Sequence, residues 1–247
     1  MGQKKKRRAD GLQPIFWWQD ASEVRMMKRA GIGIIMFCLC SVLSAGLGAQ
    51  AGEPKTAASL RSKATVETSL GSFDIELFDD DAPRTVDNFI KLAEKNFFDG
   101  LRVHRVVTGT LMQTGDEKTK DLSKVEEWGT GGKVILERGV VDDISASNSL
   151  YQEGYKKGMV VMANRGPHTS TSQFMVLLKD LPFWPRNYVI FGRVTRGLDV
   201  AQSIGSVELV PVLGPDDGRP KQDVMIKSVN VKTRPSPKVI QVSDPGK

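Results

Sequence analysis

Residues 97–116 read FFDGLRVHRVVTGTLMQTGD, and this stretch decides the predicted fold class. It contains two short runs of β-forming residues, Val103–Val107 and Leu111–Gln113, separated by Thr-Gly-Thr. Similar runs recur at residues 159–162, 174–178 and 189–194, with loops rich in Gly, Pro, Asn and Asp between them. Many short strands with few helices favour an antiparallel barrel or sandwich.

The sequence before this stretch predicts a β-hairpin followed by a helix. Val66 and then Phe73, Ile75 and Leu77 alternate with polar residues on either side of a turn at residues 70–72. Pro83 then begins a segment with apolar residues at helical spacing, and we expect the preceding Asp81 to cap its free amides. A second short helix is predicted at residues 198–204 and a last strand at 224–231.

The charge of the chain is concentrated at its amino terminus. Of the formal net charge of +6, residues 1–51 account for +5, because they hold eight Lys and Arg against three Asp and Glu. The predicted domain is therefore nearly neutral, which argues against a nucleic-acid partner. The two cysteines, Cys38 and Cys40, precede this domain, so it has no disulfide or thiolate site.

The amino-terminal region has the order of a targeting segment. A basic stretch is followed by an uncharged apolar run, residues 30–49, which is just long enough to cross a bilayer as a helix. Small residues at Ala49 and Ala51 fit cleavage after Ala51, whereas the long basic region before the run is typical of a retained anchor. Both alternatives stay open. The predicted organisation is a signal peptide or anchor at 1–51, a linker at 52–63, a domain at 64–232 and a loosely ordered tail at 233–247.

Two blocks of sequence together resemble the cyclophilin-type peptidyl-prolyl cis-trans isomerases. The first is residues 97–116, and the second is Met162–Pro167 followed by Ser172–Phe174, with support from Phe191–Val194. The resemblance runs from about residue 64 to residue 232. It implies a mainly-β fold, namely a closed eight-stranded antiparallel β-barrel capped by two helices, and an isomerase that needs no cofactor and no metal.

The resemblance also assigns roles to individual residues. It implies that Arg105 donates to the proline nitrogen of the substrate and that Gln113 orients this arginine. Ala163 and Asn164 match the backbone segment that pairs with a bound peptide. The remaining positions implied to bind substrate are Thr110, Leu111, Gln173, Met175, Phe183, Trp184 and Tyr188. Family members usually have an aromatic residue at the position of Thr110, so we expect weaker catalysis and altered specificity here.

Other sites are disfavoured by the sequence. His104 and His168 are the only histidines, too few for most metal centres. The glycine-rich residues 129–132 lack the Lys-Ser/Thr pair of a phosphate-binding loop.

Proline-containing peptides or unfolded protein segments are the implied partners. We expect a periplasmic or secreted monomer, attached to the membrane if the apolar run is retained. The alternative is a non-catalytic peptide-binding or chaperone module on the same scaffold.

Overall fold

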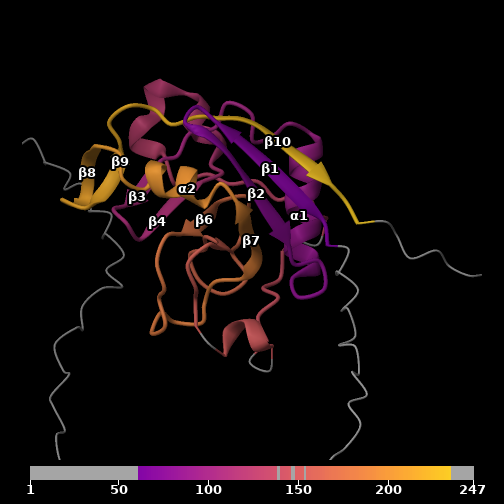
Figure 1. The fold of residues 1–247 in the computed structure, drawn as a ribbon. Coiled ribbons are helices and arrows are strands. Elements are labelled where there is room, and N and C mark those ends of the chain that lie inside the picture. The colour runs from indigo at the N-terminus through magenta and orange to yellow at the C-terminus, as the bar shows by residue number, and fades with distance from the viewer. Residues whose placement is uncertain (1–60, 138–139, 146–147, 153, 235–247) are drawn as a thin grey trace, which may run out of the picture. The chain divides into compact units, whose positions relative to one another are not determined.

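The computed structural model describes residues 61–137, 140–145, 148–152 and 154–234 (Figure 1). The predicted signal peptide or anchor, most of the linker and the tail from residue 235 lie outside these residues. Within the described ranges, no helix has the length and apolar character that crossing a membrane requires.

The described part of the chain is mainly β, as predicted. Ten strands form one antiparallel sheet in the order β10-β1-β2-β7-β5-β6-β4-β3-β9-β8. Their bounds are β1 Lys63–Thr68, β2 Gly71–Leu77, β3 Arg105–Val107, β4 Leu111–Thr114, β5 Met159–Met162, β6 Phe174–Leu177, β7 Ile190–Arg196, β8 Leu209–Gly214, β9 Asp217–Pro220 and β10 Ile226–Lys232. In β1 and β2 buried and exposed residues alternate, which is the pattern predicted from Val66 and Phe73.

The prediction of a closed eight-stranded barrel is wrong. The sheet has ten strands, and β10 and β8 are its two edges. The hairpin β8–β9 is the unpredicted part, and β9 pairs with β3, with Val106 opposite Gly218. Because β9 covers this edge of β3, the sheet continues outward instead of closing. Backbone hydrogen bonds still link residues 100–103 with residues 224–226, and Arg102 and Met225 form an isolated antiparallel bridge, but this pairing does not extend into a strand ladder.

Two α-helices occur among the described residues, as predicted, although one cap differs. Helix α1 spans Pro83–Glu94 and contacts β10, whereas α2 spans Leu198–Ile204 and contacts β2. Asp81 does not cap α1, because its carboxylate accepts from Asn148 Nδ2 and pairs with Arg61. A carboxylate from a distant loop bonds to the amino-terminal end of α1 instead. Asp143 Oδ2 accepts from the Thr85 amide at 3.2 Å. Three short 3-10 helices complete the elements, η1 Glu117–Lys120, η2 Leu122–Glu127 and η3 Ser149–Tyr151.

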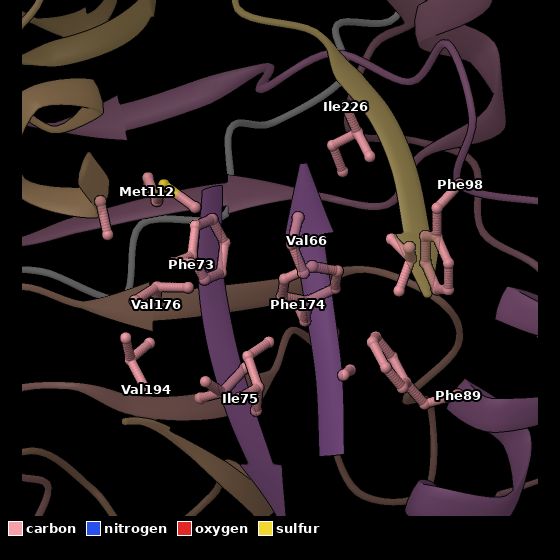
Figure 2. Packing of buried hydrophobic residues seen from close by; sticks show 14 of the residues in the cluster. Val66, Phe73, Ile75, Phe89, Phe98, Met112, Phe174, Val176, Val194 and Ile226 are labelled. Atoms are coloured by element: carbon pink, nitrogen blue, oxygen red, sulfur yellow. The ribbon is translucent and has the colours of Figure 1, made fainter. Parts of the chain in front are cut away.

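The buried apolar side chains form two clusters. The larger one joins the inner side of α1 to the sheet and contains a group of phenylalanines in edge and tilted contacts, as Figure 2 shows in part: Phe89, Phe98, Phe174 and Phe191. The smaller one lies around β4, β5 and β6 and includes Leu111, Val161 and Met175. This second cluster adjoins the residues that the sequence singles out for function.

Candidate active site

Adjacent strands bring the main predicted residues onto one face of the sheet. Arg105 on β3 lies opposite Gln113 on β4, and Gln113 lies opposite Met175 on β6. Directly opposed residues in an antiparallel sheet project to the same side. A cation, an amide and an apolar side chain therefore lie in one row across three strands, although Met175 is far from the other two in the sequence.

An apolar surface borders this row. Leu111 and Met175 lie buried beneath it in the second cluster, and the partly buried Ala163, Trp184 and Tyr188 pack against this cluster. Three of the four positions predicted to line a proline site thus belong to one cluster. The fourth, Thr110, is half-buried immediately before β4, and its hydroxyl donates to the Thr108 carbonyl at 3.3 Å.

Aromatic side chains fix one side of this surface. Trp184 stacks on Tyr188 with ring centroids 4.4 Å apart. The Tyr155 hydroxyl donates to the Tyr188 carbonyl and accepts from its amide, both at 3.0 Å, which holds the backbone of Tyr188. Burial raises the pKa of Tyr188, while the charge of Arg105 acts in the opposite direction. Phe183 differs from its neighbours, because 98% of its side chain is exposed and it packs on neither cluster.

The guanidinium of Arg105 is held at two points by a carboxylate. Its Nε donates to Asp217 Oδ1 at 2.9 Å and its Nη2 donates to Asp217 Oδ2 at 2.7 Å. The hydrogen bonds to Asp217 are the main cause of the raised pKa of Arg105, so the side chain stays charged at any working pH. The arginine side chain remains 37% exposed. Its Nη1 has no hydrogen-bond partner among the described residues.

Gln113 is engaged by a different partner. Its Nε2 donates to Gln173 Oε1 at 2.8 Å, and both side chains are buried. The Nε2 of Gln173 in turn donates to the carbonyls of Gly129 and Gly131. The two glutamines therefore connect the β4–β6 row to the glycine-rich loop at residues 129–132.

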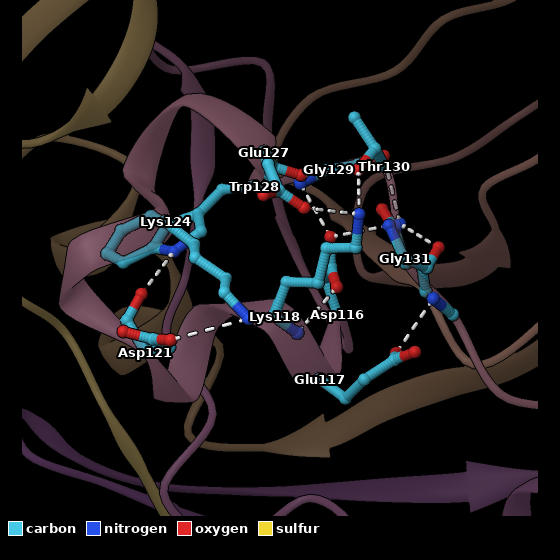
Figure 3. A network of polar contacts seen from close by, with 12 residues as sticks. Asp116, Glu117, Lys118, Asp121, Lys124, Glu127, Trp128, Gly129, Thr130 and Gly131 are labelled. Atoms are coloured by element: carbon cyan, nitrogen blue, oxygen red, sulfur yellow. Dashed lines mark hydrogen bonds and ion pairs between the residues drawn. The ribbon is translucent and has the colours of Figure 1, made fainter.

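That loop is anchored by two carboxylates, those of the buried Asp116 and the half-buried Glu117 (Figure 3). Asp116 is fully buried and accepts from the amides of Lys118, Gly129 and Gly131, and Glu117 accepts from the amide of Gly132. A Cβ at Gly131 would lie only 2.1 Å from Asp116 Oδ1, so glycine is required at this contact. The loop amides that could bind a phosphate are occupied by the protein's own carboxylates, which agrees with the sequence-based argument against a phosphate site.

The predicted backbone segment leaves the sheet directly after β5. The Ala163 amide donates to the Gln173 carbonyl at 2.9 Å, and Asn164 Nδ2 donates to the Asn187 carbonyl at 2.6 Å. Both residues are half-buried. The segment therefore adjoins the residues around Gln173 and Tyr188.

His104 is a buried neighbour of this site, and we predict that it makes folding sensitive to acid. Burial lowers its pKa to about 4 from an ordinary value of 6.5, and neither ring nitrogen has a hydrogen-bond partner among the described residues. In the unfolded chain His104 is protonated below about pH 6.5, whereas in the folded chain it stays neutral until the pH falls to about 4. This contribution to stability is complete above pH 6.5 and falls by about 3 kcal/mol as the pH decreases to 4.

Urea unfolding at pH 7 and pH 4.5 tests this prediction. The loss of unfolding free energy should be smaller in His104→Phe than in the wild type, whereas the exposed His168→Gln variant should lose as much as the wild type. Equal losses in all three proteins would show that His104 does not govern the acid response.

Asp217 is the site residue that sequence reasoning missed. It lies 112 residues after Arg105, in a segment where no strand was predicted. Its apolar neighbours Val212 and Leu213 are both 67% exposed, so the segment lacks the alternation typical of a half-buried strand. Only the pairing of β9 with β3 shows that Asp217 reaches Arg105.

Fold and site together define a class: a mainly-β domain in which a fixed, charged arginine lies beside an apolar surface shared by neighbouring strands. Residues 63–231 match the family model of the cyclophilin type peptidyl-prolyl cis-trans isomerases. The chain belongs to this family, and its enzyme class is peptidyl-prolyl cis-trans isomerase.

Curated relatives agree with this assignment, and solved structures share the fold. The peptidyl-prolyl cis-trans isomerase-like 1 of Rhizopus delemar is 36% identical over 148 residues, which cover 60% of this chain and 82% of the relative. The peptidyl-prolyl cis-trans isomerase-like 3 of Gallus gallus is 33% identical over 171 residues, covering 69% and 96%. A crystal structure of a Cryptosporidium parvum cyclophilin type isomerase has the same fold, with a TM-score of 0.59 at 24% identity, covering 71% of this chain and 99% of that one. A second structure of that protein was determined in the presence of the dipeptide Ala-Pro, with a TM-score of 0.58, 24% identity and coverage of 69% and 99%.

Proposed function

We propose that this isomerase acts on proline-containing segments of unfolded proteins outside the cytoplasm, and that Arg105 is its principal catalytic residue. The observation that carries the proposal is the fixed guanidinium of Arg105 next to the apolar cluster around Leu111 and Met175. The crystal structure of the Cryptosporidium parvum relative in the presence of Ala-Pro supports a peptide with proline as the ligand.

The chemistry follows from the amide bond itself. Rotation about an X-Pro bond removes amide resonance, at a barrier of roughly 18–20 kcal/mol. In the twisted state the proline nitrogen becomes pyramidal and regains a lone pair. A fixed donor aimed at this nitrogen binds more strongly in the twisted state than in either planar state, and this difference lowers the barrier.

Each part of the site has a role in this scheme. The apolar surface of Leu111, Met175 and Trp184 binds the proline ring, and the segment of Ala163 and Asn164 pairs with the extended peptide. Gln113 is held by Gln173 and places an amide beside Arg105, within reach of a substrate carbonyl. No bond is made or broken, so the reaction requires no group that changes protonation.

An isomerisation assay on a proline tetrapeptide tests the proposal. Turnover by the wild type that is lost in Arg105→Ala supports catalysis. Peptide binding without turnover in either protein would favour the second candidate, a peptide-binding module. The observation behind this alternative is the polar Thr110 where the apolar surface ends.

We make a separate prediction for a substitution at residue 110. We expect Thr110→Phe to raise kcat/KM several-fold, because an aromatic ring there extends the apolar surface for the proline ring. The matched control is Thr108→Phe, which adds the same ring at an exposed neighbouring position and should leave kcat/KM unchanged. An unchanged rate in Thr110→Phe would mean that residue 110 does not contact the proline ring.

The site of action is proposed from the amino-terminal sequence. The basic stretch and the apolar run at residues 30–49 support export across a membrane. Sequencing the amino terminus of the mature protein distinguishes cleavage after Ala51 from a retained anchor. A mature protein that starts at Met1 and fractionates with the cytoplasm would contradict export.

A further inference from the structure

We infer that Asp217 is a positioning residue for the isomerase reaction: it holds the guanidinium of Arg105 so that the Nη1 edge stays free for the substrate. This inference rests on the proposed role of Arg105 and adds a residue that the family resemblance did not supply. Its basis is the two-point contact, 2.9 Å from Nε and 2.7 Å from Nη2.

The hairpin β8–β9 brings Asp217 to this place. Asp217 lies opposite Val107 on β3, two residues after Arg105. Residues two apart on a strand share a face, so the side chains of Asp217 and Arg105 are diagonal neighbours on one side of the sheet. The Thr108 amide also donates to the Asp216 carbonyl at 2.9 Å, which fixes the turn end of β9 against β3.

The residue after Asp217 shows how tightly the hairpin is built. Gly218 is buried, and a Cβ added to it would lie 2.2 Å from the Val210 carbonyl oxygen on β8. No larger residue fits without moving the backbone. The position of Asp217 is therefore determined by backbone pairing on two sides, with β3 and with β8.

The two hydrogen bonds from Arg105 to Asp217, called the clamp below, matter because arginine has a long and flexible side chain. Its rotamer freedom is worth about 2 kcal/mol, and a donor that must meet a nitrogen at one geometry loses efficiency if it moves. A carboxylate that accepts from Nε and Nη2 fixes the plane of the guanidinium. Gln113 is bonded to Gln173 instead, so Asp217 is the one hydrogen-bond partner of this guanidinium within the described ranges.

The test is an isomerisation assay on a proline tetrapeptide with Asp217→Asn in the full chain. Asparagine keeps the size of the side chain but removes the charge and one of the two acceptors. We expect kcat to fall about 10-fold to 100-fold with KM little changed, since the substrate still binds while the donor is misplaced. The matched control is Asp216→Asn, whose exposed side chain makes no contact with Arg105 and which should retain wild-type kcat.

A double-mutant cycle separates positioning from a general structural effect. If Asp217 acts through Arg105, Asp217→Asn has no further effect on kcat in an Arg105→Ala background. An undiminished effect in that background would overturn the inference, and so would a wild-type or raised kcat in the single variant. An inactive wild type, or full activity in Arg105→Ala, would instead contradict the proposed function.

A spectroscopic measurement on the wild type avoids any problem of folding in the variant. Side-chain ¹⁵N NMR should show Arg105 with slow rotation about the Nε–Cζ bond, unlike the exposed Arg186. Fast rotation of the Arg105 guanidinium would show that the clamp is absent in solution and would overturn the inference.

Discussion

Replacing Arg105 with alanine is expected to lower kcat/KM for a proline tetrapeptide by about 100-fold to 1,000-fold, which is the usual cost of removing a fixed donor from a transition state. The reason is that Arg105 supplies the one charged donor of the row formed with Gln113 and Met175. The apolar surface stays intact in this variant, so KM should change much less than kcat. A continuous isomerisation assay over a range of peptide concentrations gives both constants.

The control for this variant is Arg196→Ala. Arg196 also pairs with an aspartate, Asp74, but it lies at the end of β7 and its side chain is 76% exposed. Its removal should leave kcat/KM at the wild-type value. If Arg105→Ala also retained wild-type turnover while Asp217→Ala did not, the assignment of the catalytic donor would be wrong.

Loss of the buried Asp116 carboxylate is expected to have the largest effect on stability. In Asp116→Ala the amides of Lys118, Gly129 and Gly131 lose their acceptor together. Partly buried donors that lose their partners cost free energy, and for three of them we expect the free energy of unfolding to fall by about 3 kcal/mol. For a domain of this size that corresponds to a decrease in Tm of roughly 6–12 °C.

The same variant should also affect the site. The carbonyls of Gly129 and Gly131 accept from Gln173, so a displaced loop releases Gln173 and with it Gln113. Thermal unfolding and kcat/KM at 25 °C measure the two effects separately. Asp121→Ala is the matched control, because Asp121 caps a neighbouring 3-10 helix at the surface and should change both quantities much less. A Tm within 2 °C of the wild type in Asp116→Ala would contradict the role of Asp116 as the anchor of the loop.

The local sequence pattern predicted an element correctly wherever one face of that element packs on the hydrophobic core. The alternation in β1 and β2 and the helical spacing around Phe89 predicted the correct elements, because each depends on the burial of a single face. The segment containing Arg105 and Gln113 was recognisable because its residues match the cyclophilin-type family in order. Its strands β3 and β4 pair Arg105 with Gln113, and the register follows from their short connection.

The two structural predictions that were wrong share a different cause. Asp81 was expected to cap α1, but Asp143 bonds to Thr85 there, and the two residues are 58 positions apart. The closed barrel was expected from the resemblance, but β9 adds to the edge of β3. In both cases a polar or edge group finds its partner in a distant segment, and local pattern has no information about that choice.

The sequence by itself therefore determined the family of this protein and its mainly-β class, and it predicted the residues of the candidate site apart from Asp217. The tertiary structure alone decided which partners hold those residues, namely Asp217 for Arg105 and Gln173 for Gln113. The physical reason is that burial of an apolar face leaves a periodic trace in the sequence, whereas a hydrogen bond or ion pair depends on the position of two atoms brought together by backbone pairing.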